Sequence, residues 1–157
     1  MFIEIKMAPI LSRISQELFY LTNNARVKYD RKMLKRDPIL TKAALYHSRD
    51  MAKNHYCDHI NLKGEDPTDR VIRLGFDVNA GYYCGVGENC NQISIGKVKG
   101  SGFIPNTEKG IALGLMKNWR KSEEHWKNII RWDYTQIGTG VATTNNKTYF
   151  ATQVFYG

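Results

Sequence analysis

Apolar residues recur at helical spacing near the start of the chain. Intervals of three and four residues place such side chains along one face of a helix. Five of them follow this spacing: Leu11, Ile14, Leu18, Leu21 and Ala25. The pattern predicts a first helix over residues 11–29, with Ser12 as the candidate cap of its amino end.

A second helix is predicted to begin at Asp37 and Pro38 and to run to Asn54. An Asp side chain accepts hydrogen bonds from the free backbone N–H groups of a helix start, and Pro tolerates the first helical position. His47 shares the apolar face of this helix with Leu40, among others. We interpret it as a core histidine whose hydrogen bonds are satisfied rather than as a ligand.

The middle of the chain is richer in turns. Asp66 and Pro67 open a short third helix that Gly75 ends, after a polar stretch over residues 56–66. Beyond it we expect a strand around residues 82–84, a sharp turn at residues 85–87 and a long loop over residues 96–105.

The last third of the chain predicts two helices and a hairpin. Ile111, Leu115 and Trp119 mark one face of a helix over residues 106–121, and a short helix over residues 122–130 follows with Ser122 as its cap. Apolar and polar residues alternate over residues 136–143 and 147–155, on either side of Asn145 and Asn146. This pattern predicts a β-hairpin with a tight turn at the two asparagines.

The order of these elements indicates the fold class. Helices, a strand region, a helix and a hairpin do not alternate as in a parallel α/β protein, so we expect an α+β sandwich with a small, mainly antiparallel sheet. At 157 residues the chain has the size of one domain. We assign residues 11–157 to that domain and residues 1–10 to an N-terminal extension.

Charge adds an attraction to polyanions. The formal net charge is +8 and the isoelectric point is about 9.4, and the densest basic cluster spans residues 28–36. No helix-turn-helix, zinc-finger or RNP pattern accompanies the cluster, so we do not expect nucleic acid as a partner.

No apolar run reaches the roughly 20 residues that a transmembrane helix needs. Glu4 and Lys6 interrupt any signal-peptide core, which leaves a cytoplasmic chain or one whose signal was removed.

The cysteines leave several states open. There are three, Cys57, Cys84 and Cys90, so they cannot all pair within one chain. Cys84 and Cys90 are near enough in sequence for a disulfide that leaves Cys57 free, and three reduced thiols are the alternative. Because no CxxC pair exists, we do not expect a thiolate zinc site.

Taken together, these segments resemble the CAP superfamily, of the SCP-like or cysteine-rich secretory protein type and in its prokaryotic form. The matching segments follow the family order, at residues 23–26 (NNAR), 40–51, 59–76, 87–89 (GEN), 119–130 (WRKSEEHWKNII), 137–141 and 149–155. The resemblance implies a three-layer α–β–α sandwich.

The resemblance also implies a cleft lined by His59, Glu88 and His125. Many eukaryotic members carry a glutamate where this sequence has Ser122, so one acid of the cleft is absent here. Two imidazoles and a carboxylate can bind Zn²⁺ or another divalent cation, act as acid and base, or form a buried polar network. His59 and His125 are the candidate metal ligands, and no residue is assigned as catalytic.

Two functions follow from this resemblance. The first is a secreted-type, extracellular binding module rather than a classical enzyme, with a small amphipathic lipid, a glycan or an anionic cell-surface polymer as its ligand. The alternative is a divalent-metal-dependent or histidine-based hydrolase of peptidase type.

Overall fold

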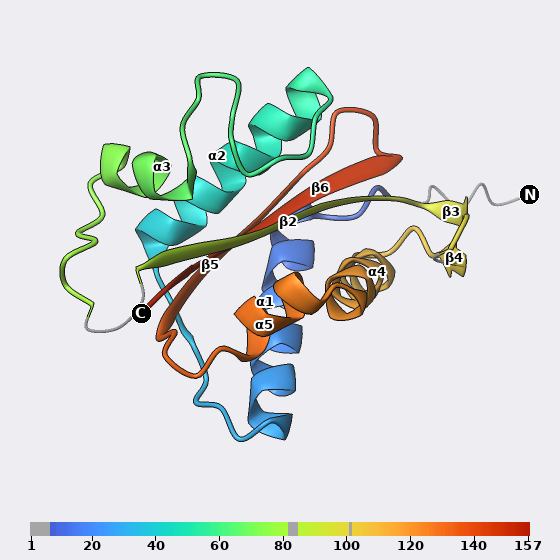
Figure 1. Ribbon diagram of the computed structural model, residues 1–157. Helices are drawn as coiled ribbons and strands as arrows, with labels where there is room; N and C mark the ends of the chain where they lie inside the picture. The colour runs from blue at the N-terminus through green and yellow to red at the C-terminus, as the bar shows by residue number, and fades with distance from the viewer. Residues whose placement is uncertain (1–6, 82–84, 101) are drawn as a thin grey trace, which may run out of the picture.

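Helices cover both faces of a central β-sheet (Figure 1). The computed structural model describes residues 7–81, 85–100 and 102–157. The helices are α1 (Leu11–Lys28), α2 (Pro38–Asn54), α3 (Pro67–Arg73), α4 (Glu108–Lys121) and α5 (Glu123–Ile130). The strands are β1 (Lys35–Arg36), β2 (Val86–Ser94), β3 (Gly96–Val98), β4 (Gly102–Ile104), β5 (Gln136–Ala142) and β6 (Thr148–Tyr156).

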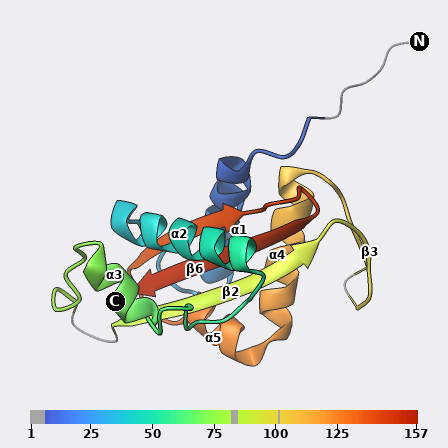
Figure 2. The ribbon, with the colours of Figure 1, turned by 90° about the horizontal axis from the view of Figure 1, so that it is seen from above.

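The main sheet has the strand order β1-β5-β6-β2. β6 is antiparallel to both β5 and β2, and the short β1 runs parallel to β5. Helices α2 and α3 lie on one face of this sheet, and α1, α4 and α5 lie on the other (Figures 1 and 2). We call these the α2/α3 layer and the α1/α4/α5 layer. The predicted α+β fold with three layers and a mainly antiparallel sheet is confirmed.

Both layers bury apolar residues, but to different extents. The α1/α4/α5 layer forms one continuous cluster with the sheet that includes Ile14, Leu18, Ile111, Leu115, Trp119, Ile129, Ile137 and Phe155. The α2/α3 layer contributes two smaller clusters, one around Leu40 and Val71 and one around Met51 and Phe150. The main hydrophobic core therefore lies beneath the sheet, on the side of α1.

Helix α2 packs directly against the backbone of β5. A Cβ atom at Gly138 would lie 2.0 Å from the carbonyl carbon of Leu40, and one at Gly140 would lie 2.2 Å from the nitrogen of Leu45. Only glycine allows a helix and a strand to approach this closely, because any side chain there would overlap the helix backbone.

Several helix boundaries agree with the sequence patterns. The Asp37 side chain accepts from the N–H groups of Ile39 and Leu40 at the start of α2. At the start of α3, Asp66 forms a reciprocal capping pair with Asp69. The expectation for Ser12 is wrong, because Ile10 occupies the N-cap position of α1 and no side chain caps that helix.

Two expectations for the middle of the chain are wrong, and a third concerns residues outside the described part. Gly85 has a positive φ of 71°, but the chain is a strand from Val86 onward, so residues 86 and 87 form no turn. The expected loop over residues 96–105 contains the antiparallel pair β3 and β4. The strand expected at residues 82–84, and with it Cys84, lies outside the described residues. No helix among the described residues is both long and apolar enough to cross a membrane.

Candidate functional site

Glu88 is a buried carboxylate on the edge strand β2. Its partner across the strand pair is Val154, which packs against Leu40 and Val71, so Glu88 faces the α2/α3 layer. Only 6% of the residue is exposed. A buried carboxylate needs a compensating positive charge or several hydrogen bonds, and the neighbouring elements supply both.

Arg70 of α3 supplies the charge. Its Nη2 donates to Glu88 Oε2 at 2.5 Å, in an ion pair whose two side chains are almost completely buried. Its Nη1 donates to the carbonyl oxygens of His59 and Glu65, at 2.7 and 2.9 Å. Arg70 therefore joins α3, the loop after α2 and strand β2, and its hydrogen bonds help to offset the cost of burying two charges.

His59 lies on that loop and contacts the other carboxylate oxygen. Its Nδ1 is 3.0 Å from Glu88 Oε1, and 47% of its side chain is exposed. The hydrogen bond to Glu88 raises the pKa of His59 above its ordinary value, since a carboxylate stabilises the charged imidazolium. The resemblance names both residues as cleft residues, and that role stays a prediction.

His47 of α2 completes the surroundings of Glu88. Its fully buried ring places Nε2 2.7 Å from the carbonyl oxygen of Asp58 and 3.7 Å from Glu88 Oε1. Nδ1 has no hydrogen-bond partner among the described residues, so the expectation of a fully satisfied core histidine is wrong at this atom. Burial lowers the pKa of His47, which favours a neutral ring beside the ion pair.

His125 approaches the same region from the opposite layer. It lies in α5, and its carbonyl oxygen accepts from Asn89 Nδ2 at 3.0 Å. Burial, followed by the charge of His59, lowers the pKa of the His125 ring. The hydrogen bond to Asn89 places the backbone of His125 against the edge strand β2, one residue along that strand from Glu88.

Ser122 and the acids beside it take no part in this network within the described residues. Ser122 lies at the start of α5 as expected, but its side chain forms no cap hydrogen bond. Glu123 is exposed and pairs with Lys127 at 2.7 Å. Neither residue bonds to His59 or Glu88 in the described part of the chain.

The thiol of Cys90 lies against His59, and that of Cys57 belongs to the same loop as His59. Cys90 is buried two residues after Glu88 on the same face of β2, and its Sγ is 3.7 Å from His59 Nδ1. Cys57 is exposed on the loop, and its interaction with the Cys90 thiol lowers the pKa of Cys57. The same interaction, together with burial, raises the pKa of Cys90. The signal for Cys90 was its two-residue spacing from Glu88, which is informative only once residues 86–94 are known to be a strand.

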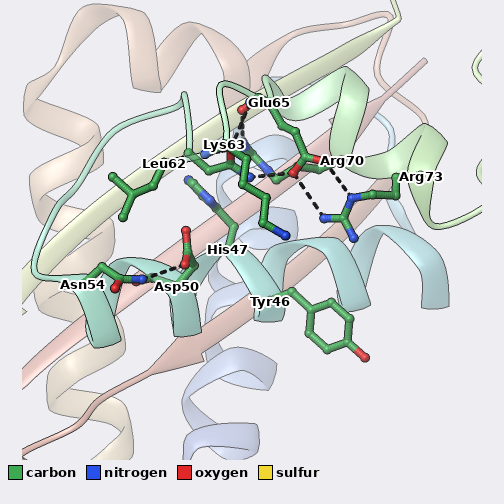
Figure 3. A pocket seen from close by; sticks show the side chains of 10 residues that line it. Tyr46, His47, Asp50, Asn54, Leu62, Lys63, Glu65, Arg70 and Arg73 are labelled. Atoms are coloured by element: carbon green, nitrogen blue, oxygen red, sulfur yellow. Dashed lines mark hydrogen bonds and ion pairs between the residues drawn. The ribbon is translucent and has the colours of Figure 1, made fainter.

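A pocket of about 360 Å³, lined mainly by residues with polar or charged groups, opens beside this network, between α2, α3 and the loop (Figure 3). Tyr46, Asp50 and Asn54 line it from α2, Lys63 reaches in from the loop, and Arg73 lines it from α3. His47 and Arg70 form its inner wall, so the pocket adjoins the buried Glu88. The arrangement can hold a small polar ligand against residues whose positions the ion pair fixes.

Comparisons with known proteins agree with this architecture. Two relatives in Bacillus subtilis (strain 168) carry the names "Uncharacterized membrane protein YlbC" and "Uncharacterized protein YkwD". The first is 29% identical over 136 residues, which are 87% of this chain and 34% of that protein. The second is 30% identical over 147 residues, which are 94% of this chain and 48% of that protein. This chain therefore spans about a third to a half of the length of the curated relatives it matches.

Solved structures give the same result for the fold. A crystal structure of an extracellular protein containing a SCP domain from Bacillus anthracis str. Ames is 26% identical, has a TM-score of 0.70, and matches 94% of this chain and 41% of that one. A crystal structure of NaASP2 with Zn²⁺ has a TM-score of 0.59 over 91% of this chain and 78% of that one; at 13% identity it shows likeness of fold only. A family model, "CAP: Cysteine-rich secretory protein family", matches residues 19–155. Because that match covers most of the sequence, this chain belongs to the CAP family of cysteine-rich secretory proteins.

Proposed function

We propose that this chain is an extracellular binding module whose pocket between α2, α3 and the loop holds an anionic, hydroxyl-rich ligand of the kind found in cell-surface polymers. The observation that carries the proposal is the composition of that pocket. Side-chain carboxylates, amides and guanidinium groups surround it, and Tyr46, a residue that is 41% exposed, offers an aromatic ring. Such groups suit a ligand with many hydroxyl groups better than the apolar chain of a lipid.

The preference for negative charge that we propose rests on Lys63. The Arg73 guanidinium is already paired with Glu65, and Asp50 accepts from Asn54 and from the Tyr56 hydroxyl. Within the described residues no acid pairs with the Lys63 ammonium, which extends across the pocket toward α2 (Figure 3). The net charge of +8 adds a general attraction to an anionic surface.

The state of Glu88 supports binding over hydrolysis. Arg70 occupies one carboxylate oxygen, and His59 and His47 approach the other. A carboxylate held in this way is a poor candidate for a nucleophile or a general base, because its lone pairs are already engaged.

The extracellular location is proposed by analogy with two relatives. The Bacillus anthracis protein is described as extracellular. One Bacillus subtilis relative is named as a membrane protein, which is compatible with attachment at the cell surface.

The pocket can be tested by binding measurements with defined probes. We expect a soluble glycerol-phosphate polymer to bind more tightly than a neutral glucan or vesicles of a zwitterionic phospholipid, as measured by calorimetry. Lys63→Gln and Tyr46→Ala should each weaken the binding. Lys117→Gln removes an equal charge at an exposed position of α4, in the opposite layer, and serves as the matched control. Equal losses for Lys63→Gln and Lys117→Gln would show that only net charge matters, and tighter binding to vesicles would favour a lipid ligand.

One observation favours a second function, a histidine-based or metal-dependent hydrolase. The pKa of His59 is raised and that of His125 is lowered, and such a divergence suits a general acid and a general base. A divalent cation between the two imidazoles is the metal version of this idea, and the NaASP2 structure with Zn²⁺ makes it reasonable to test. Peptide and ester hydrolysis should then depend on both rings. If His59→Ala and His125→Ala leave any hydrolysis and the metal content unchanged, the enzyme hypothesis fails.

A further inference from the structure

A second cavity, of about 610 Å³, opens at the edge of the main sheet. Helices α1 and α2 cover opposite faces of the sheet (Figure 1), and the cavity lies between them along β5. Strand β1 pairs only with the first two residues of β5, so residues 139–141 have no strand beside them on that edge within the described chain, and they line the cavity. The cavity shares no lining residue with the pocket described above. It also includes none of His59, Glu88 and Cys90, whose potential ligand atoms lie within 4.8 Å of one another.

Both helices present a row of side chains to this cavity. Residues four apart lie on one face of a helix, and Thr41, Leu45 and Arg49 of α2 follow this spacing. Ser12 and Gln16 do the same in α1. The lining therefore combines hydroxyl, amide and guanidinium groups with apolar side chains, as is typical of sites for small polar ligands.

The charge that lines this cavity is positive. Arg36 of β1 and Arg49 of α2 are both exposed and both line it, and its described lining residues include no acid. The arginines that form ion pairs in the described part of the chain are Arg13, Arg70, Arg73 and Arg131. No carboxylate there neutralises Arg36 or Arg49, so their two charges are available to an anion.

Arg36 is held in position before any ligand binds. The two residues that flank it donate backbone hydrogen bonds to β5, at 2.9 and 3.0 Å. Its guanidinium carbon lies 4.5 Å from the centroid of the Phe19 ring. A guanidinium above an aromatic ring keeps its N–H groups available along its edge. Because the side chain is already placed, less conformational entropy is lost when it binds an anion.

We propose that this cavity binds a phosphomonoester, with Arg36 and Arg49 contacting the phosphate oxygens. Such an ester carries a charge of about −1.5 to −2 at neutral pH, which matches two guanidinium groups better than a carboxylate with its single charge does. A planar guanidinium can donate two parallel hydrogen bonds to phosphate oxygens. The hydroxyl groups of Ser12 and Thr41 and the amide of Gln16 line the same cavity and suit the hydroxyl groups of a sugar.

Calorimetry on the full chain tests the class of ligand. The probes are the primary phosphate monoester of glucose, the matching sulfate monoester, and glucose itself. The sulfate has the same tetrahedral shape with a single charge. We expect the phosphate ester to bind at least about tenfold more tightly than the sulfate ester, because hydrogen bonds between charged groups strengthen with the charge. Equal affinity for the two esters, or for glucose, would overturn the proposal.

Variants of the two arginines test the position of the ligand. Arg36→Gln and Arg49→Gln should each weaken binding of the phosphate ester by about tenfold or more, and Arg36→Lys, which keeps only the charge, should give a smaller loss. Arg120→Gln is the matched control, because that guanidinium also lies over an aromatic ring, Trp126 at 4.9 Å, but lines a different cavity. It should retain affinity within about twofold, since exposed charges far from the ligand are screened. A loss as large as that of Arg36→Gln would reduce the effect to net charge and refute the site.

Two further measurements identify the source of the phosphate and separate this site from the proposed function. Vesicles that contain phosphatidic acid present the same group on a lipid. Tighter binding to these vesicles, lost in Arg36→Gln, would make the ligand a lipid headgroup, and tighter binding to the glucose ester would make it a small molecule. Lys63→Gln should leave binding of the ester unchanged. If Lys63→Gln abolishes that binding, the ester occupies the other pocket and this proposal fails, whatever the polymer measurements show.

Discussion

The two faces of the central sheet are stabilised in different ways. Beneath the sheet, α1, α4 and α5 bury one continuous apolar cluster around Trp119. Above it, α2 and α3 bury two smaller clusters, with the ion pair of Arg70 and Glu88 and the ring of His47 also buried on that face. The α1/α4/α5 layer therefore supplies most of the apolar burial that stabilises the fold. The α2/α3 layer buries charged and polar groups that lower stability unless they are paired, and the candidate site lies in that layer.

The two buried guanidinium groups show the same contrast. Arg26 in α1 donates to four backbone carbonyl oxygens, those of Lys32, Ile129, Arg131 and Tyr134. Burial lowers its pKa to about 10, so it remains charged at neutral pH. Arg70 instead divides its bonds between carbonyl oxygens and the carboxylate of Glu88. The first arginine ties together backbone segments of the core layer, and the second fixes a side chain of the site.

The largest expected effect tests the apolar layer. Trp119→Ala removes a fully buried indole and its hydrogen bond to the carbonyl oxygen of Cys90. The free energy of unfolding should fall by about 3–5 kcal/mol, because the surrounding side chains cannot fill the cavity. Urea denaturation followed by circular dichroism measures the loss. A loss below about 1 kcal/mol would show that this layer is not the main source of stability.

The next effect tests the polar layer with two ion pairs of the same chemistry. Glu88→Gln leaves the Arg70 charge buried without its partner and should cost about 3 kcal/mol. Glu65→Gln breaks the pair with Arg73, whose side chain is 51% exposed, and should cost at most about 1 kcal/mol. Denaturant unfolding of both variants gives the comparison. Equal costs would mean that burial does not govern the strength of these pairs.

A smaller effect should be the same in both layers. Asp37 caps α2 and Thr107 caps α4 through side-chain hydrogen bonds to backbone N–H groups. Asp37→Ala and Thr107→Ala should each lower stability by about 1 kcal/mol, because each leaves helix donors unpaired. Ser122 forms no such bond, so Ser122→Ala should cost clearly less. Thermal unfolding of the three variants measures these losses. The largest drop in melting temperature for Ser122→Ala would contradict the prediction.

The smallest effect is the pH dependence of the histidines around Glu88. The raised pKa of His59 means that its pairing with Glu88 stabilises the fold below the ordinary value of 6.5, and that this contribution is lost as the pH rises through the folded pKa. The lowered pKa of His47 acts in the opposite direction, since stability falls as the unfolded chain takes up a proton below 6.5.

These signs can be separated by mutation. The stability difference between the natural chain and His59→Asn should be larger at about pH 5 than at about pH 8. NMR titration should place the pKa of His59 above 6.5, and Glu88→Gln should lower it. A pKa of His59 that does not respond to Glu88→Gln would contradict the pairing.

Local signals in the sequence predicted much of this fold. Asp37 and Asp66 marked helix starts because capping depends only on neighbouring residues. The hairpin of β5 and β6 was readable from the turn at Asn146, which has a positive φ of 54°, and from the flanking strands. Elements that depend on distant partners were missed. Strand β1 has two residues and exists only because β5 lies beside it, and β3 and β4 are too short for an alternating pattern.

The candidate site was less accessible from sequence. Its residues were reached through resemblance to a family, and the pattern of the chain did not indicate that His59 and Glu88 meet. His47 was placed in the core correctly, but its contact with Glu88 and its unpaired Nδ1 depend on α2 packing over the sheet. Cys90 was missed because its relation to Glu88 becomes visible only in a strand, and the start of that strand was interpreted as a turn.

The place of β6 in the sheet constrains how the molecule is made. This strand pairs with β5 on one side and β2 on the other, and it follows every other described element along the chain. On the ribosome, β2 therefore has no strand to join until β6 has emerged, and the helices synthesised before it have no finished sheet to cover. The main sheet can therefore close only after β6 has been synthesised, and until then the apolar helix faces that this sheet covers have no partner surface.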